Sequence, residues 1–201
     1  MSPAQRRWLG FALLVAWGLV YIAVFAYLKW NSRDFLLTQR LQAVCNEQRC
    51  PRLPLPVHMP LDDLAKLPEI MVSGWGHPEP GGVWTIAKQA YLSLPIDPSA
   101  AYPLRVKLDV EAALSEAVTS QRVRVMNQDG TTLAEHRLTQ NASLGTLDFL
   151  IRQPDANPSG AVILSVSVPD AWVQAKHTDS ADQRLLGVRL RRLSITPESM
   201  Q

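Results

Sequence analysis

The sequence predicts an all-β fold: an antiparallel β-sandwich or jelly roll, preceded by one N-terminal transmembrane helix and a proline-rich stalk. Three observations support this fold class. Residues 8–28 carry no charge, four prolines fall within residues 51–60, and from residue 70 onward apolar residues alternate with polar ones. An alternation of period two is typical of strands with one buried face and one solvated face.

These patterns divide the chain into four predicted parts. They are an N-terminus at 1–7, a transmembrane helix at 8–28, a juxtamembrane helix and stalk at 29–69, and a β-sandwich domain at 70–196. The whole chain of 201 residues is long enough for one such domain and an anchor.

The uncharged segment is predicted to be a membrane anchor that is not cleaved. As a helix, residues 8–28 would cover roughly 31 Å, which matches the hydrocarbon core of a bilayer. A cleaved signal peptide has a shorter apolar run that ends in small residues, whereas this run ends in "AVFAYLKW". Basic residues are nearly balanced on its two sides, so they leave the orientation open.

The two cysteines, Cys45 and Cys50, follow this segment closely. They are either unrelated thiols, half of a metal site that lacks its second pair of ligands, or a small disulfide loop. We favour the disulfide, which requires an oxidising compartment. This choice places the N-terminus in the cytoplasm and the bulk of the chain on the other side of the membrane.

The stalk and the first strands follow from local patterns. The four prolines favour an extended spacer at the end of segment 29–69. "PLRVKLDVEA" at 103–112 and "QRVRVM" at 121–126 alternate as strands do. "NQDG" at 127–130 predicts a tight turn, with "TTLAEHRL" at 131–138 as the returning strand.

The last predicted strand, "LGVRLRRLSI", contains a break in its alternation. Leu190 and Leu193 both belong to the core face, although they are separated by two residues. One extra residue at Arg191–Arg192 therefore indicates a β-bulge. The pattern leaves open whether the two arginines face solvent as a binding patch or only end the core face.

The residues that could carry chemistry do not form a catalytic set. The sequence has no G-x-S-x-G motif, and its four histidines are scattered; His77 and Glu79 are only two potential metal ligands. The net charge of +2 gives no electrostatic footprint for nucleic acid. We therefore expect no enzyme, no cofactor and no transition metal, although a calcium ion held by backbone carbonyls leaves no sequence trace.

The tryptophans of the β domain, Trp75, Trp84 and Trp172, lie near predicted turns. Their flat faces are suited to stacking on sugar rings, but large aromatic side chains also fill cores. We favour a core position for Trp84 and leave both readings open for Trp75 and Trp172. Together with Glu79 and Arg184, these tryptophans make up the candidate ligand-binding set.

A resemblance to a known family rests on two motifs, one at the opening and one at the close of the β domain. They are Ser73, Gly74, Trp75, Glu79, Trp84 and Thr85, and then Asp182, Arg184, Leu186 and Gly187. From about residue 72 to residue 195, the chain resembles envelope β-sandwich modules attached to bacterial membrane glycosyltransferases and phosphoglycerol-transferase-like proteins. The inserted "HPEPGG" departs from that pattern, and we expect no catalytic domain within these residues.

This resemblance implies a jelly-roll-like module in a glycan-related setting. The compartment that it implies is the bacterial inner membrane, with the β domain in the periplasm. The partners that it implies are an envelope glycan or an inner-membrane glycosyltransferase or assembly complex.

The closing motif also has a physical interpretation of its own. Arg184 is expected to form a bidentate pair with Asp182, or instead to pair with Glu79 and so tie the first and last segments of the domain together. Gly187 is expected to permit a turn or a close backbone approach at the last strand.

Two functions fit these observations. The first is a membrane-anchored, non-catalytic module for glycan recognition, or an accessory to envelope polysaccharide synthesis, and it predicts exposed aromatics beside polar groups. The second is a structural or assembly subunit that docks onto an inner-membrane protein complex. It predicts either an exposed apolar patch or a transmembrane face of packed small residues, such as Gly10, Ala12, Ala16 and Gly18. We favour the first.

Overall fold

The computed structural model describes residues 17–25, 52–62, 70–97, 99–152 and 161–200. The chain forms two compact units, residues 1–43 and 44–201. In the first unit, residues 17–25 are helical with exposed side chains, and none of the described helices is long and apolar enough to cross a membrane. The pair Cys45–Cys50 and most of the predicted anchor lie outside the described residues.

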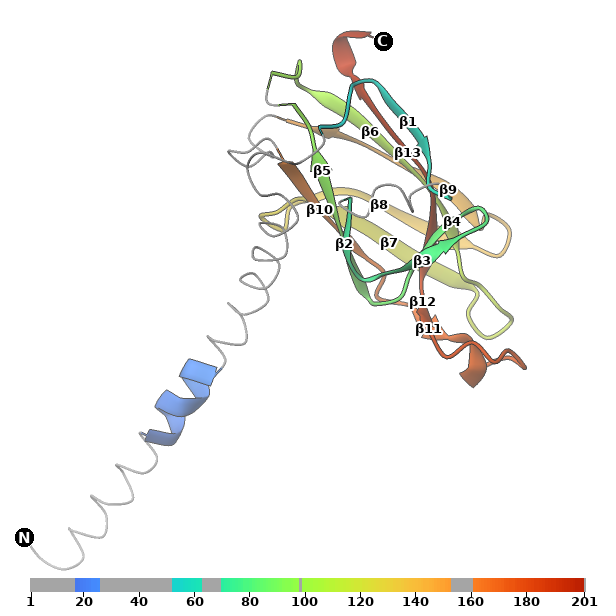
Figure 1. The fold of residues 1–201 in the computed structure, drawn as a ribbon. Coiled ribbons are helices and arrows are strands. Elements are labelled where there is room, and N and C mark those ends of the chain that lie inside the picture. The colour runs from blue at the N-terminus through green and yellow to red at the C-terminus, as the bar shows by residue number, and fades with distance from the viewer. Residues whose placement is uncertain (1–16, 26–51, 63–69, 98, 153–160, 201) are drawn as a thin grey trace, which may run out of the picture. The chain divides into compact units, whose positions relative to one another are not determined.

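The second unit is the predicted all-β sandwich (Figure 1). Its first sheet has the order β3 (Trp75–Glu79), β4 (Gly82–Thr85), β13 (Val188–Pro197), β6 (Leu104–Ala112), β9 (Leu144–Ile151), with β1 (Val57–Pro60) also paired to β13. Its second sheet has the order β2 (Met71–Ser73), β5 (Gln89–Pro95), β10 (Ala161–Ser167), β7 (Ser120–Met126), β8 (Thr132–Thr139). A small ribbon pairs β11 (Trp172–Val173) with β12 (Leu185–Leu186), and short 3₁₀ turns cover Gln174–Lys176 and Glu198–Met200.

The connectivity is that of a jelly roll. The eight main strands, in chain order, are β4, β5, β6, β7, β8, β9, β10 and β13. The first sheet arranges the first, eighth, third and sixth of these strands side by side, and the second sheet arranges the second, seventh, fourth and fifth. This alternation between sheets brings the ends of the domain together, because β4 and β13 become neighbours.

One continuous core fills the space between the two sheets. On β6, Leu104, Val106 and Leu108 are fully buried, while the charged residues between them lie on the outer face. Val123 and Val125 of β7 approach the same core from the opposite sheet. The alternation of apolar and polar residues in the sequence therefore indicates which residues face the core and which lie on the outer face of the sheet.

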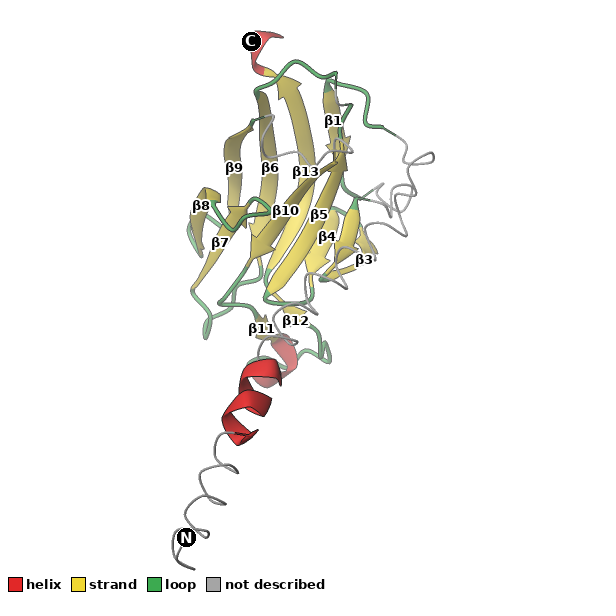
Figure 2. Ribbon diagram, turned by 90° about the vertical axis from the view of Figure 1, so that its left-hand side faces the viewer, coloured by secondary structure: helices red, strands yellow, loops and turns green. Residues whose placement is uncertain are grey.

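Strand β1 differs from the sequence prediction, which assigned residues 29–69 to the stalk. Val57 is buried and Met59 packs against the core, so this segment belongs to the sandwich. β1 and β4 share the same edge of β13, one beside each half of the long strand (Figure 2). The prolines that suggested a spacer are compatible with β1, because proline is tolerated on edge strands.

The predicted β-bulge is confirmed. The pairing between β13 and β6 shifts between Leu190 and Arg192, so Arg191 is the extra residue. Arg191 and Arg192 are both exposed on the outer face, so both of them face solvent. The backbone oxygen of Arg191 accepts a hydrogen bond of 2.9 Å from the backbone N–H of Leu61, at the end of β1.

The predicted close approach at Gly187 is also confirmed. A Cβ atom at this position would lie 2.7 Å from Oγ1 of Thr85 and 2.7 Å from Cγ1 of Val168. Thr85 is itself fully buried, and its Oγ1 accepts a hydrogen bond of 3.0 Å from the backbone N–H of Val188. Only a residue without a side chain lets β4 and β13 approach this closely.

We expect Gly187→Ala to lower the free energy of unfolding by about 1–3 kcal/mol, because the added methyl group overpacks a buried contact. Urea denaturation followed by circular dichroism measures this change. Gly76→Ala is the matched control: its φ is not in the left-handed region, and the atom nearest to its would-be Cβ is Cγ2 of the exposed Ile86 side chain, at 3.1 Å. A loss no larger at residue 187 than at residue 76 would contradict the packing argument.

Candidate functional site

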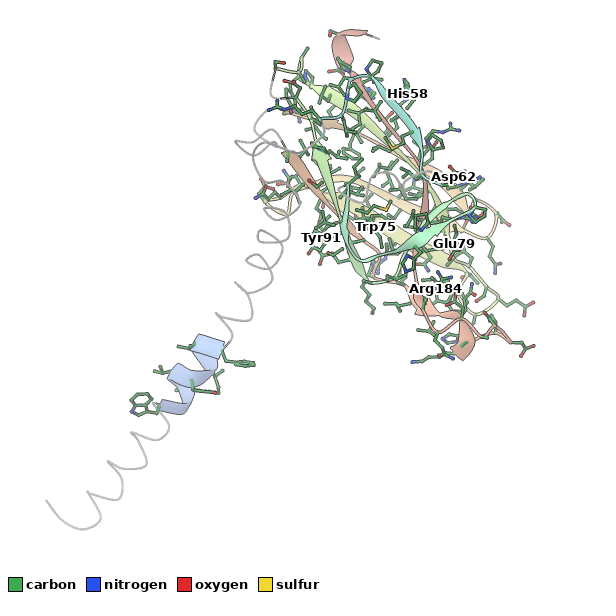
Figure 3. The ribbon with its side chains drawn as sticks, viewed as in Figure 1. His58, Asp62, Trp75, Glu79, Tyr91 and Arg184 are labelled. Carbon is green, nitrogen blue, oxygen red and sulfur yellow. The ribbon has the colours of Figure 1, made fainter. Side chains whose placement is uncertain are left out.

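Arg184 makes both of the contacts that the sequence proposed as alternatives. Its Nε lies 3.0 Å from both carboxylate oxygens of Asp182, and its Nη2 donates to Asp182 Oδ2 at 2.7 Å. Its Nη1 donates to the Glu79 carboxylate (Figure 3). Because Glu79 ends β3 and Arg184 precedes β12, the guanidinium joins the opening of the domain to its closing segment.

Hydrogen bonding among Glu79, Asp182 and Arg184 favours the charged forms of Asp182 and Arg184. The hydrogen bonds from the Arg184 side chain hold the pKa of Asp182 below its ordinary value. In turn, Asp182 and then Glu79 raise the pKa of Arg184. All three guanidinium nitrogens are engaged within the protein, so Glu79 and Arg184 act here as a cross-link.

Two of the three candidate tryptophans are packing residues. Trp172 is only 6% exposed, and its indole N–H donates to the backbone oxygen of Ala113 at 2.8 Å. Trp75 is half-buried against the core, and its indole N–H donates to the backbone oxygen of Tyr91 at 2.8 Å. In each case the polar end of the ring is satisfied inside the protein, as expected for buried tryptophan.

Trp84 lies on the outer face of the first sheet rather than in the core, where the sequence analysis favoured it. Its neighbours Val83 and Thr85 are fully buried, so the alternation of β4 directs Trp84 outward. The Arg189 guanidinium lies 5.1 Å from the centre of the Trp84 ring, within the range of a cation–π contact. The same guanidinium donates from Nε to Glu111 on β6 at 3.2 Å.

The candidate ligand-binding set therefore does not converge on one place. Glu79 and Arg184 come together in a cross-link, Trp75 and Trp172 support the fold, and Trp84 lies on the outer face of the first sheet. Another part of that outer face forms the groove described next.

A groove of about 530 Å³ lies on the outer face of the first sheet, at the bulge of β13. The chain contributes to it from the end of β1, from the turn between β3 and β4, from β6 and β13, and from the start of β9. Its lining consists of Pro60, Asp62, Gly81, Asp109, Val110, Leu144, Gly145, Thr146, Arg191 and Arg192. We call this feature the bulge groove.

The bulge groove combines hydrogen-bond acceptors, hydrogen-bond donors and an apolar side chain. Asp109 accepts a hydrogen bond of 2.7 Å from Oγ1 of Thr146. Arg192 approaches Asp109 only to 3.8 Å, which is too long for a hydrogen bond. Leu144, which is 55% exposed, adds apolar surface at the start of β9. A ligand with many hydroxyl groups and an apolar C–H face matches this combination.

No arrangement for metal or nucleophilic chemistry stands out in the part of the chain that the structure describes. Within it, no group of three or more His, Cys, Asp and Glu side chains could hold a metal ion. His77 is exposed, and Glu79 pairs with Arg184.

The sequence analysis missed most of the groove residues. Asp62 fell in the predicted stalk, and Asp109 and Thr146 looked like ordinary polar positions of two strands. The one available signal was the bulge, which singled out Arg191 and Arg192.

The resemblance of this chain to known proteins is distant. Neither a protein-family model nor a curated protein matches the sequence. Among solved structures, the chain is similar to CsCBM6-3 of Clostridium stercorarium in complex with cellobiose, at 10% identity and a TM-score of 0.41, over 75% of this chain and 100% of that one. A family 6 carbohydrate-binding module has 13% identity and a TM-score of 0.38, over 74% and 100% of the two chains.

A third solved structure, the xylan-binding module CBM15, has 11% identity and a TM-score of 0.34, over 71% of this chain and 97% of that one. All three neighbours are carbohydrate-binding modules. The similarities are too distant to assign a ligand, so any function for this chain has to be argued from its own site.

We expect Arg184→Met to lower the free energy of unfolding by about 1 kcal/mol at pH 7, because it breaks two partly exposed ion pairs. The pKa of the Asp182 carboxyl is lower in the folded state than its ordinary value of 3.8. The ionised carboxylate therefore stabilises the fold at a pH above 3.8, and this stabilisation is lost as the pH falls below that value and the carboxylate is protonated. The difference between wild type and variant should therefore shrink below about pH 4.

Thermal unfolding between pH 3 and pH 7 measures this difference. Arg191→Met serves as a control, because the Arg191 side chain makes no hydrogen bond to another described residue. A difference for Arg184→Met that stays constant across this pH range would contradict the assigned role.

Proposed function

We propose that the sandwich is a non-catalytic glycan-recognition module and that it binds its ligand in the bulge groove. The observation that carries the proposal is the lining of this groove, where carboxylates, guanidinium groups and a threonine lie beside exposed Leu144. A sugar hydroxyl both donates and accepts hydrogen bonds, so it needs both kinds of partner. The volume of about 530 Å³ lies within the range of ligand sites, roughly 300–1,000 Å³.

The position of the groove also favours an extended ligand. Its lining reaches from Asp62 at the end of β1, across β13 and β6, to Thr146 on β9. A ligand in it would cross neighbouring strands of the first sheet. A short stretch of a polysaccharide fits such a path better than a single sugar.

For the cellular setting, we propose a module anchored in the bacterial inner membrane by residues 8–28. Residues 1–7 would be cytoplasmic and the sandwich periplasmic, serving as an accessory to envelope polysaccharide synthesis. Support comes from the uncharged segment, from the pair Cys45 and Cys50, and from the resemblance to envelope modules.

The assembly alternative has less support. It predicts a contiguous apolar patch of several hundred Å². In the described part of the sandwich, the large hydrophobic side chains that are exposed are Ile86, at 38%, and Leu144, at 55%. Two such side chains fall short of a patch of that size.

The test is calorimetric titration of the full-length protein, in a mild detergent, with a panel of envelope oligosaccharides. We expect saturable binding, and we expect Asp109→Asn to weaken it about tenfold, because an amide replaces a charged acceptor in the groove. Asp148→Asn is the matched control: Asp148 lies on the same face but pairs with Arg105 outside the groove.

Unchanged affinity in Asp109→Asn, or an equal loss in both variants, would contradict binding in the bulge groove. Absence of binding across the panel would contradict glycan recognition altogether.

A further inference from the structure

We infer that the glycan bound in the bulge groove is acidic and that its anionic groups bind Arg191 and Arg192. This inference rests on the proposed function and names the chemical class of its ligand. It is carried by the direction, the hydrogen bonding and the charge of the two arginines.

The bulge places the two arginines side by side. In a regular strand, consecutive side chains point to opposite faces of the sheet. Here the extra residue at Arg191 lets Arg191 and Arg192 both reach the outer face, while Leu190 and Leu193 remain in the core. The two side chains are 42% and 63% exposed, and both line the groove.

Both guanidinium groups keep their hydrogen-bond donors unused. Within the described residues, Arg191 and Arg192 make no side-chain hydrogen bond, and their closest carboxylate oxygens lie at 3.7 Å and 3.8 Å. Other arginines of the same face are engaged: Arg105 donates to Asp148 at 3.1 Å, and Arg189 donates to Glu111. The groove thus presents two neighbouring guanidinium groups whose N–H donors are not used in hydrogen bonds to described residues.

The carboxylates nearby are engaged by other partners. Glu111 Oε2 accepts two hydrogen bonds from Arg189, so Arg191 shares a carboxylate that is already occupied. Asp109 faces Arg192 but is also held by Thr146. Neither carboxylate accepts a hydrogen bond from Arg191 or Arg192.

The remaining acidic residue of the lining, Asp62, forms no ion pair with a described residue. Asp62 follows β1, and its carboxylate oxygens are able to accept hydrogen bonds from hydroxyl groups of the same ligand. The groove therefore offers an anion-binding end at the bulge and a hydroxyl-binding residue beside it.

An oxyanion is the group that best uses two adjacent guanidinium forks. Carboxylate and phosphate oxygens accept parallel N–H bonds from arginine, with a geometry that hydroxyl groups do not provide. A uronic acid and a sugar phosphate share this chemistry. A neutral glycan would leave the N–H donors of Arg191 without an anionic acceptor at hydrogen-bond distance.

The experiment is calorimetric titration of the full-length protein, in a mild detergent, with matched pairs of ligands. The uronic acid arm uses oligogalacturonate and oligomannuronate hexasaccharides against their carboxyl-reduced forms. The phosphate arm uses mannopentaose phosphate against mannopentaose, and inorganic phosphate is tested alone. We expect the acidic member of at least one pair to bind about tenfold more tightly than its neutral partner.

The variants locate the effect. Arg191→Ala and Arg192→Ala should each reduce the preference for the acidic ligand about tenfold and leave the affinity for the neutral ligand nearly unchanged. Arg124→Ala removes an arginine that pairs with Glu135 on the second sheet, and it should change neither affinity.

The outcomes separate this inference from the proposed function. Equal affinity for acidic and neutral ligands would overturn the inference and leave glycan recognition standing. Absence of binding by every oligosaccharide would overturn both. If inorganic phosphate binds as tightly as the oligosaccharides, the ligand is not a glycan. If Arg124→Ala reduces the preference for the acidic ligand as much as Arg191→Ala and Arg192→Ala do, the assignment of that preference to the bulge is overturned.

Discussion

The extra residue in β13 is the constraint on which the first sheet and its groove depend. Without it, the alternation that buries Leu190 would turn Leu193 and Ile195 toward solvent. With it, both halves of the strand bury their apolar residues, and two arginines reach the outer face. The bulge also offers the backbone oxygen of Arg191 to Leu61, which fixes the end of β1 beside the groove.

The residues that looked most functional in the sequence instead hold the sandwich together. Arg184 links Glu79 to Asp182, and Gly187 lets the buried Thr85 approach the last strand. At the end of β6, the backbone oxygen of Ala113 accepts hydrogen bonds from the indole of Trp172 and from the amide of Gln121. Most residues of the opening and closing motifs thus have a structural role, and the proposed binding site lies on the outer face of the first sheet.

Local patterns predicted much of the fold. The alternation of β6, the hairpin between β7 and β8, and the bulge of β13 each depend on residues close together in sequence. Local patterns also produced two wrong expectations. Trp84 was expected in the core because of its size, although buried Val83 and Thr85 on either side direct it outward.

The second wrong expectation was the stalk around β1, because its prolines suggested a spacer. An edge strand accepts proline, and the partner that makes this segment a strand is β13, at the far end of the chain. The bulge groove escaped prediction for the same reason. Asp62, Asp109 and Thr146 come from distant parts of the sequence, and only the jelly-roll connectivity brings them together.

The central claim is that a glycan binds across the bulge of β13. Its most direct test is to follow backbone amide resonances by NMR while an acidic oligosaccharide is added. We expect the resonances of Leu61, Arg191 and Thr146 to shift in a saturable way, while that of Ala113 stays in place. Shifts confined to the surroundings of Trp172 and Arg184, with the groove unchanged, would contradict the claim.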